Sequence, residues 1–191
     1  MKVVAVIPAR QWSVGTPGKN RDGFENALMA AQQVANAGIL LTTDDPLLWL
    51  KDGVTVITRP PDLEDGPTEA VIAHAVSDVH ADAVLVLQPS SPTLCRADYC
   101  RAAIARLAAD HEATSVVSVV PWGGEPPQKA VYVRGGVLMI PQIARRQDCA
   151  PAYRRDGTVY LTRLSYAKAG DLYGPRPVPL LVTPRDSVTV D

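Results

Sequence analysis

Short apolar runs alternate with amphipathic stretches along the first part of the chain. The runs at 3–7, 38–42, 54–57, 83–87 and 115–120 are typical of buried strands. Between them, apolar side chains recur at helical spacing in 25–36, 68–79 and 98–109. This alternation predicts a single-domain α/β fold with a mostly parallel, doubly wound sheet, in which ligands bind beyond the carboxyl ends of the strands.

The pattern changes after residue 120. Residues 121–127 are rich in Pro and Gly, and 129–133 and 137–140 predict a short hairpin around a Gly-Gly turn. We interpret 121–150 as an excursion from the sheet within one domain spanning 1–191, with further strands at 158–162 and 188–190.

Charge and composition reduce the number of function classes that the chain fits. The chain has 191 residues, with 19 basic and 20 acidic side chains and a net charge of −1. Without a basic field, and without basic runs interleaved with aromatic residues, we expect no nucleic-acid partner. No apolar stretch approaches the length of a membrane span, and the N-terminus does not resemble a signal peptide. Cys95, Cys100 and Cys149 have no metal-ligand spacing, which predicts reduced thiols in a cytoplasmic protein.

The loop after the first strand carries the clearest chemistry. Its glycines allow backbone N–H groups to approach phosphate oxygens, and its cations neutralise phosphate charge. The spacing matches neither a P-loop nor a dinucleotide-binding fingerprint. The candidate residues of this loop are Arg10, Ser13, Gly15, Gly18, Lys19 and Asn20.

Residues 8–20 resemble the Pro-Ala-Arg-x-x-Ser-x-Gly-x-Pro-Gly-Lys-Asn signature of the cytidylyltransferases that activate sialic acid and related 2-keto-3-deoxy sugar acids. The resemblance continues in order over nearly the whole chain, and the sialic-acid branch, acting on nonulosonic acids, fits better than the 3-deoxy-manno-octulosonate branch. The other matching segments are Thr43-Asp-Asp, Arg59-Pro-x-x-Leu-x-Asp, Leu87-Gln-Pro-Ser-Ser-Pro, Ser115-Val-Val-Ser, Arg146-Gln-Asp, Pro151-Ala-Tyr-Arg-Arg-Asp-Gly and Val159-Tyr.

This resemblance implies a nucleotide-diphospho-sugar transferase fold of glycosyltransferase-A-like type. It also implies transfer of CMP from CTP to the anomeric hydroxyl of a sialic-acid-like sugar acid, with release of pyrophosphate and with Mg²⁺ as cofactor. Residues 121–150 would form a homodimer, in which one subunit completes the sugar pocket of the other. The implied roles are catalysis for Lys19 and Arg10, nucleotide binding for Arg10, Ser13, Gly15, Gly18, Lys19, Asn20, Arg59 and Thr68, and substrate binding for Gln88, Lys129, Arg146, Arg154, Asp156 and Tyr160.

Two departures from the family pattern affect the chemistry. Thr189 replaces the first of two metal-binding aspartates, which leaves Asp191 as the expected magnesium ligand. Asp156 stands where Asn is usual, which favours a sugar other than plain N-acetylneuraminate. The alternative hypothesis is a catalytically weakened nucleotide-binding or interaction subunit, which CTP binding without turnover would indicate.

Overall fold

The computed structural model describes residues 1–10, 19–45, 52–89, 96–124, 126–140 and 145–183, with only the backbone of Lys19, Arg21, Asp22 and Arg146. Ser13, Gly15, Gly18 and Asp191, and the strand expected at 188–190, lie outside these residues.

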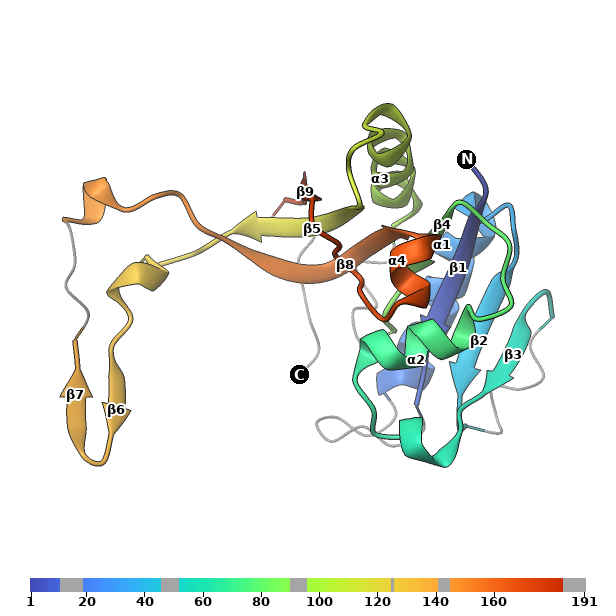
Figure 1. Ribbon diagram of the computed structural model, residues 1–191, viewed down its shortest axis with the longest axis horizontal. Helices are drawn as coiled ribbons and strands as arrows, with labels where there is room; N and C mark the ends of the chain where they lie inside the picture. The colour runs from blue at the N-terminus through green and yellow to red at the C-terminus, as the bar shows by residue number, and fades with distance from the viewer. Residues whose placement is uncertain (11–18, 46–51, 90–95, 125, 141–144, 184–191) are drawn as a thin grey trace.

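The core of the protein is one seven-stranded sheet with strand order β3-β2-β1-β4-β8-β5-β9 (Figure 1). All strands are parallel except β8, which runs antiparallel to both of its neighbours. The predicted mostly parallel sheet is therefore confirmed. The strands are β1 (Val3–Pro8), β2 (Ile39–Thr43), β3 (Thr55–Thr58), β4 (Ala83–Val86), β5 (Ser115–Pro121), β8 (Tyr153–Arg163) and β9 (Pro177–Leu181).

Helices cover both faces of the sheet. The core on one face contains residues of α1 (Lys19–Val34) and α3 (Ala97–Ala109), and the core on the other contains residues of α2 (Thr68–Ala75) and α4 (Leu164–Lys168). Alternate residues of β1 enter the two cores, Val3 and Ala5 on the first side and Val4 and Val6 on the second. This two-sided burial explains why the strand reads as a continuous apolar run.

Strand β9 was not predicted, because prolines interrupt it. Pro177 and Pro179 lack the N–H that a central strand would need to donate. They are accommodated because β9 is at the edge of the sheet, where it pairs only with β5.

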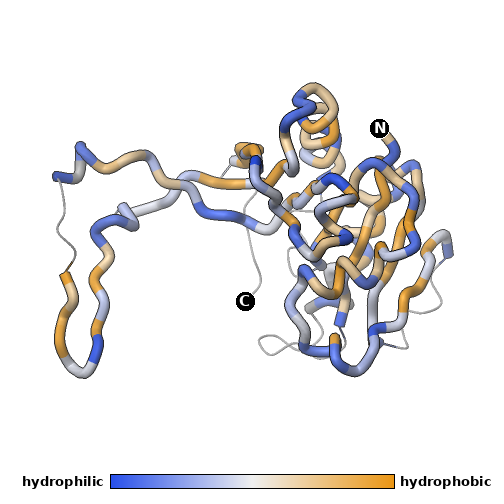
Figure 2. Tube along the Cα trace, viewed as in Figure 1, coloured by the Kyte–Doolittle hydropathy of each residue, from blue (hydrophilic) through white to orange (hydrophobic). Residues whose placement is uncertain are grey.

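Between β5 and β8 the chain leaves the sheet as a long arm (Figure 1). The arm carries two short 3₁₀ turns, η3 (Pro127–Lys129) and η4 (Arg146–Asp148), and a hairpin of β6 (Tyr132–Arg134) and β7 (Val137–Met139). The predicted hairpin is confirmed, with shorter strands than expected. All residues of both strands are exposed, and all except Arg134 are apolar or aromatic (Figure 2).

Two expectations from composition bear on the described residues. None of their helices has the length and apolar character needed to cross a membrane. Cys100 and Cys149 are free thiols, whereas Cys95 lies outside the described residues.

Candidate active site

A buried arginine lies at the carboxyl ends of β2 and β3. Thr43 of β2 pairs with Thr58 of β3, so Arg59 follows directly at this edge. Arg59 is 9% exposed. Its Nε donates to Thr42 Oγ1 at 3.3 Å and its Nη2 donates to the Thr42 carbonyl at 3.1 Å. The guanidinium is thus anchored to β2 by two donors.

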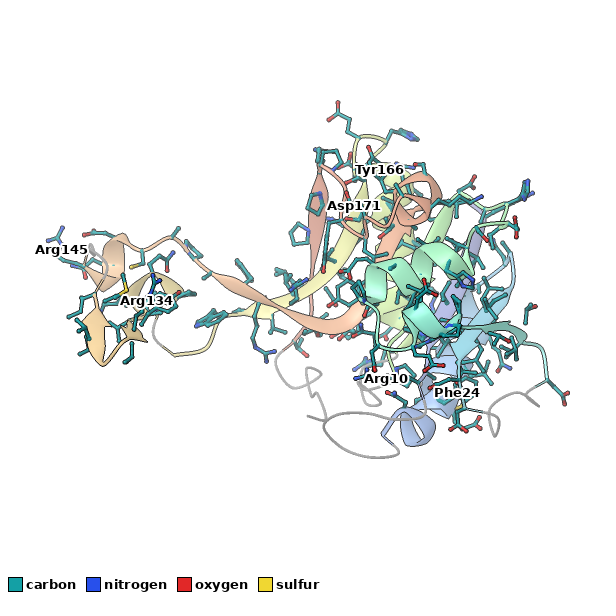
Figure 3. The ribbon with its side chains drawn as sticks, turned by 60° about the horizontal axis from the view of Figure 1, so that its bottom comes forward. Arg10, Phe24, Arg134, Arg145, Tyr166 and Asp171 are labelled. Atoms are coloured by element: carbon teal, nitrogen blue, oxygen red, sulfur yellow. The ribbon has the colours of Figure 1, made fainter. Side chains whose placement is uncertain are left out.

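A second cation lies close to the first. Burial lowers the pKa of Arg59, the charge of Asp44 opposes this effect, and the charge of Arg10 adds to it. Arg10 follows the end of β1 (Figure 3), and its Nη1 is 3.2 Å from Asp65 Oδ1. Asp65 is 93% exposed, so water screens much of this ion pair. Two neighbouring guanidinium groups of this kind favour an anionic ligand.

Asn20 links the start of α1 to Arg10. Its Nδ2 donates to the Arg10 carbonyl at 2.9 Å, which ties the first turn of α1 to the segment that follows β1. The backbone of Lys19 begins α1 at the same place. Arg10, Asn20 and Arg59, three of the predicted nucleotide-binding residues, therefore belong to one edge of the sheet.

A cavity of ≈ 370 Å³ lies between α2 and the first half of β8. It brings together Gln88, Arg154, Asp156 and Tyr160, which the sequence assigned to the sugar acid, and Thr68, which it assigned to the nucleotide. The complete lining is Thr68, Glu69, Gln88, Arg154, Arg155, Asp156, Gly157, Tyr160, Leu172 and Tyr173. Sequence reasoning missed Glu69, Arg155, Gly157, Leu172 and Tyr173 as lining residues; the last two follow α4, where no sequence motif marks them.

The antiparallel course of β8 places its first residues in this cavity. Tyr160 pairs with Val86, so the residues before it extend past the carboxyl end of β4. A bulge then redirects the strand, because Val117 pairs with Tyr160 whereas Val119 pairs with Arg155. Gly157, with φ of 83°, provides the left-handed conformation inside the bulge.

The bulge is filled by two local hydrogen-bonding arrangements. Ser118 Oγ accepts from the Val159 N–H at 2.8 Å and donates to the Val159 carbonyl at 3.1 Å. Asp156 is 2% exposed, and its two oxygens accept from the Thr158 N–H at 3.2 Å and from Thr158 Oγ1 at 2.5 Å. The Asp156 carboxylate therefore lines the cavity while it also stabilises the strand.

Two tyrosines and an arginine form one wall. The rings of Tyr160 and Tyr173 meet edge to face with centroids 6.4 Å apart. The Arg155 guanidinium lies 5.4 Å from the centre of the Tyr173 ring and donates to the Tyr173 hydroxyl. Burial raises the pKa of Tyr160; the neighbouring Tyr173 and the charges of Asp156 and Glu69 add to this effect, whereas the charge of Arg155 opposes it. The Tyr160 hydroxyl thus remains a hydrogen-bond donor at neutral pH.

Lys129 and Arg146, the other two predicted substrate contacts, are not brought to the cavity by this chain. They belong to η3 and η4 on the arm (Figure 1). The cavity within a single chain contains four of the six predicted substrate residues.

The described residues contain no group of three His, Cys, Asp or Glu side chains arranged to hold a metal ion. Asp45 is buried, and its N–H donates to Thr43 Oγ1 at 2.9 Å. The described donors alone therefore do not make up a magnesium site.

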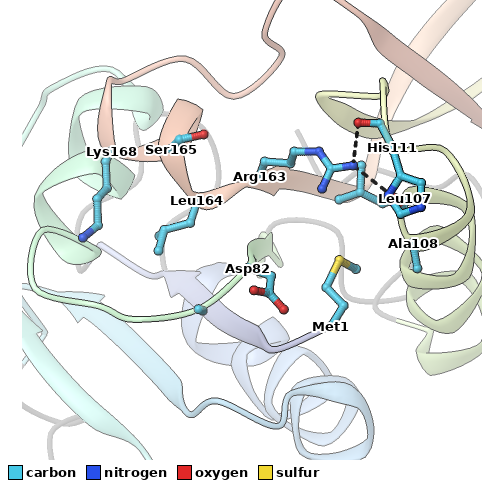
Figure 4. Close-up of a pocket in the computed structure, with 10 residues that line it drawn as sticks. Met1, Asp82, Leu107, Ala108, His111, Arg163, Leu164, Ser165 and Lys168 are labelled. Atoms are coloured by element: carbon cyan, nitrogen blue, oxygen red, sulfur yellow. Dashed lines mark hydrogen bonds between the residues drawn. The ribbon is translucent and has the colours of Figure 1, made fainter.

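A larger cavity, of ≈ 660 Å³, lies near the start of β1 and the end of β8 (Figure 4). Its central side chain, Arg163, donates to the carbonyls of Ala113, Asp110 and His111 at 2.7, 3.1 and 3.2 Å. These bonds satisfy carbonyl groups at and beyond the C-terminus of α3, which is a structural role. Size alone does not identify the site, because the predicted residues gather at the opposite edge.

Comparison with known proteins identifies the fold. The sequence matches no protein-family model and no curated protein. The structure is similar to a CMP:2-keto-3-deoxy-manno-octonic acid synthetase complexed with CTP, with a TM-score of 0.72 and 19% identity over 96% of this chain and 90% of the other. It is also similar to 2-C-methyl-D-erythritol 4-phosphate cytidylyltransferase from Francisella tularensis, with a TM-score of 0.68 and 11% identity over 100% and 94%. The Thermus thermophilus enzyme of the same name has a TM-score of 0.59 and 15% identity, over 100% of this chain and 93% of the other. The chain therefore has the single-domain α/β fold, with a mostly parallel sheet, that these cytidylyltransferases share.

Proposed function

We propose that this protein is a cytidylyltransferase that transfers CMP from CTP to the anomeric hydroxyl of a 2-keto-3-deoxy sugar acid and releases pyrophosphate. The observation that carries the proposal is the cavity in which Gln88, Arg154, Asp156 and Tyr160 meet. The family resemblance implies that these side chains bind the sugar acid. The structural neighbours named above, one of them complexed with CTP, support the same reaction class.

The charges divide the site into two parts. Arg10 and Arg59 lie near one another beside β1, β2 and β3, and we assign them to the phosphates and cytidine end of CTP. Arg154 and Arg155 line the cavity beside β8, and we assign them to the carboxylate of the sugar acid. The two reactants would then meet near the ends of β1 and β4, which are neighbours in the sheet.

The reaction is an in-line displacement. The anomeric oxygen forms a bond to the α-phosphorus, the bond from that phosphorus to the bridging oxygen breaks, and pyrophosphate leaves. The protein contributes mainly by positioning the reactants and neutralising charge. Lys19, at the start of α1, is the residue we assign to stabilising charge at the α-phosphate. The Mg²⁺ expected at Asp191 remains part of this proposal, and it would supply further charge neutralisation.

The arm supports a homodimer. Lys129 and Arg146 are on the arm of a chain whose cavity they do not line, so any contact of these two residues with a sugar would be made to the cavity of a second copy. The hairpin strands are exposed, with Tyr132, Val133 and Val137 at 68%, 71% and 65%. An isolated two-stranded hairpin is only marginally stable in water, and an apolar surface of this kind favours a partner.

The test is pyrophosphate release from CTP, with and without Mg²⁺, over a panel of nonulosonic and octulosonic acids. We expect release with one nonulosonic acid and none with Mg²⁺ removed. Release with the octulosonic acid alone would show that the substrate belongs to the 3-deoxy-manno-octulosonate branch and is not sialic-acid-like. CTP binding without turnover of any acid would favour the alternative, a catalytically weakened nucleotide-binding subunit.

A further inference from the structure

The cavity beside β8 has charges of both signs. Arg154 and Arg155 line it together with Glu69 and Asp156. A pocket for a substrate whose only charge is a carboxylate would be complementary if cations alone lined it. Two carboxylates among the lining residues therefore need an explanation of their own.

The two carboxylates differ in their surroundings. Asp156 is almost fully buried, and both of its oxygens already accept hydrogen bonds from Thr158. Glu69 is half-buried in the first turn of α2, and no described residue forms a hydrogen bond or ion pair with its carboxylate. The side chain of Glu69 nevertheless lines the cavity, together with Tyr160 and the two arginines.

The position of Glu69 in α2 accounts for only part of this arrangement. A carboxylate in the first turn is favourable because it interacts with the helix dipole. A substrate that fills the cavity would, however, remove water from Glu69, and the loss of hydration is costly unless the substrate supplies a compensating cation or donor. Arg154 and Arg155, the cations that line the same cavity, are assigned to the carboxylate of the substrate, and the Tyr160 hydroxyl is a neutral group.

We propose that the cavity selects sugar acids that carry a protonated amino group, with Glu69 as the counter-ion of that group. This inference rests on the proposed function, since it specifies the acid which that reaction activates. Arg154 and Arg155 would bind the carboxylate at one end of the substrate, and Glu69 would accept charge-assisted N–H···O bonds at the other. The site is thereby complementary to a zwitterion.

The experiment compares two sugar acids that are identical except that one carries a free amine where the other carries an N-acetyl group. Each acid is assayed with wild type and with Glu69→Gln. We expect wild type to favour the free amine by roughly tenfold or more in kcat/KM, as hydrogen bonds to charged groups generally allow. Glu69→Gln should abolish this preference through KM, with kcat nearly unchanged. Glu64→Gln is the matched control, because Glu64 is a nearby exposed acid that does not line the cavity.

Equal or better use of the N-acetylated acid by wild type would overturn the inference and leave the proposed function intact. A preference that persists in Glu69→Gln would also overturn it. Binding of both acids to the CTP complex is measured by calorimetry in parallel. If the free-amine acid binds more tightly but is not turned over, the proposed reaction is wrong and the role of Glu69 is supported. If both acids bind equally, the role of Glu69 is wrong.

Discussion

At the scale of single residues, Arg59 shows how a buried cation is prepared for a ligand. Its Nε and Nη2 are committed to Thr42, so the side chain is held in place before any ligand binds. Burial and the nearby Arg10 both oppose its charge, whereas Asp44 supports it. An arriving phosphate would therefore add to a prearranged site rather than order a mobile one.

We predict that Arg59→Lys weakens CTP binding about tenfold while the protein remains folded. Lysine keeps the charge but lacks the planar fork that binds Thr42 through two donors at once. Isothermal titration calorimetry with CTP measures the effect. Thr42→Val, which removes only the Oγ1 acceptor, should cause a smaller loss, and unchanged affinity in Arg59→Lys would exclude Arg59 from the nucleotide site.

At the scale of elements, the close approach of α1 to the end of β4 sets the geometry of the site. Gly23 of α1 faces the backbone of Pro89, which directly follows the cavity residue Gln88. A Cβ at position 23 would lie 1.8 Å from the Pro89 carbonyl oxygen. Only a residue without a side chain fits there, so the helix and the cavity edge depend on one another.

We predict that Gly23→Ala destabilises the protein by about 1–3 kcal/mol, although Ala is the better helix former by about 1 kcal/mol. Backbone atoms cannot move aside as a flexible side chain can, so α1 must shift away from Pro89. Thermal unfolding measures the loss, and KM for the sugar acid should rise as well.

Gly123→Ala is the control for this substitution, because nothing lies within 4 Å of a Cβ at that position. It should leave stability and KM unchanged. Equal stability of Gly23→Ala and wild type would show that α1 does not pack this tightly.

At the scale of the whole molecule, the arm is unlike the rest of the protein. The sheet has apolar residues enclosed on both faces, whereas the hairpin exposes Leu138 at 58% and Val137 at 65% (Figures 1 and 2). Exposure of these residues in the single chain is costly, and a second copy that covers them would reduce that cost.

We predict that wild type is a dimer and that Leu138→Asp converts it to a monomer. A buried charge in a subunit interface is unfavourable, whereas the same charge on an exposed hairpin leaves the fold of one chain intact. Light scattering measures the mass, and kcat/KM for the acid should fall together with dimerisation.

Arg134→Ser, a polar change at the end of β6, is the control for the hairpin and should preserve the dimer. A monomeric wild type with full activity would contradict both the dimer and the role of Lys129 and Arg146 at a neighbouring site.

The parts of the fold that depend on local pattern could be predicted from the sequence. The strands β1, β2, β4 and β5 are mostly apolar runs buried on both sides, and a short continuous apolar run predicts such a strand directly. α4 and β9 could not be predicted, because one is a single short turn and the other contains Pro177 and Pro179. Their existence depends on neighbours, namely the end of β8 and the edge of β5.

The site divides in the same way. Gln88, Arg154, Asp156 and Tyr160 could be selected because the family resemblance, carried by motifs in order along the chain, implies that they bind the substrate. The contribution of Glu69, Arg155 and Tyr173 to the same cavity depends on packing. These residues come from α2, β8 and the segment after α4, and no local pattern links them.

The sequence by itself determined an α/β fold with a mostly parallel sheet, and its family resemblance predicted the residues of a nucleotide and sugar-acid site. Only the tertiary structure decided that β8 runs antiparallel, that its bulge directs Asp156 into the cavity, and that Lys129 and Arg146 lie away from it. The physical reason is the range of the interactions. Burial periodicity and loop chemistry act between near neighbours in the chain, whereas strand direction, bulges and the course of the arm follow from contacts between distant segments.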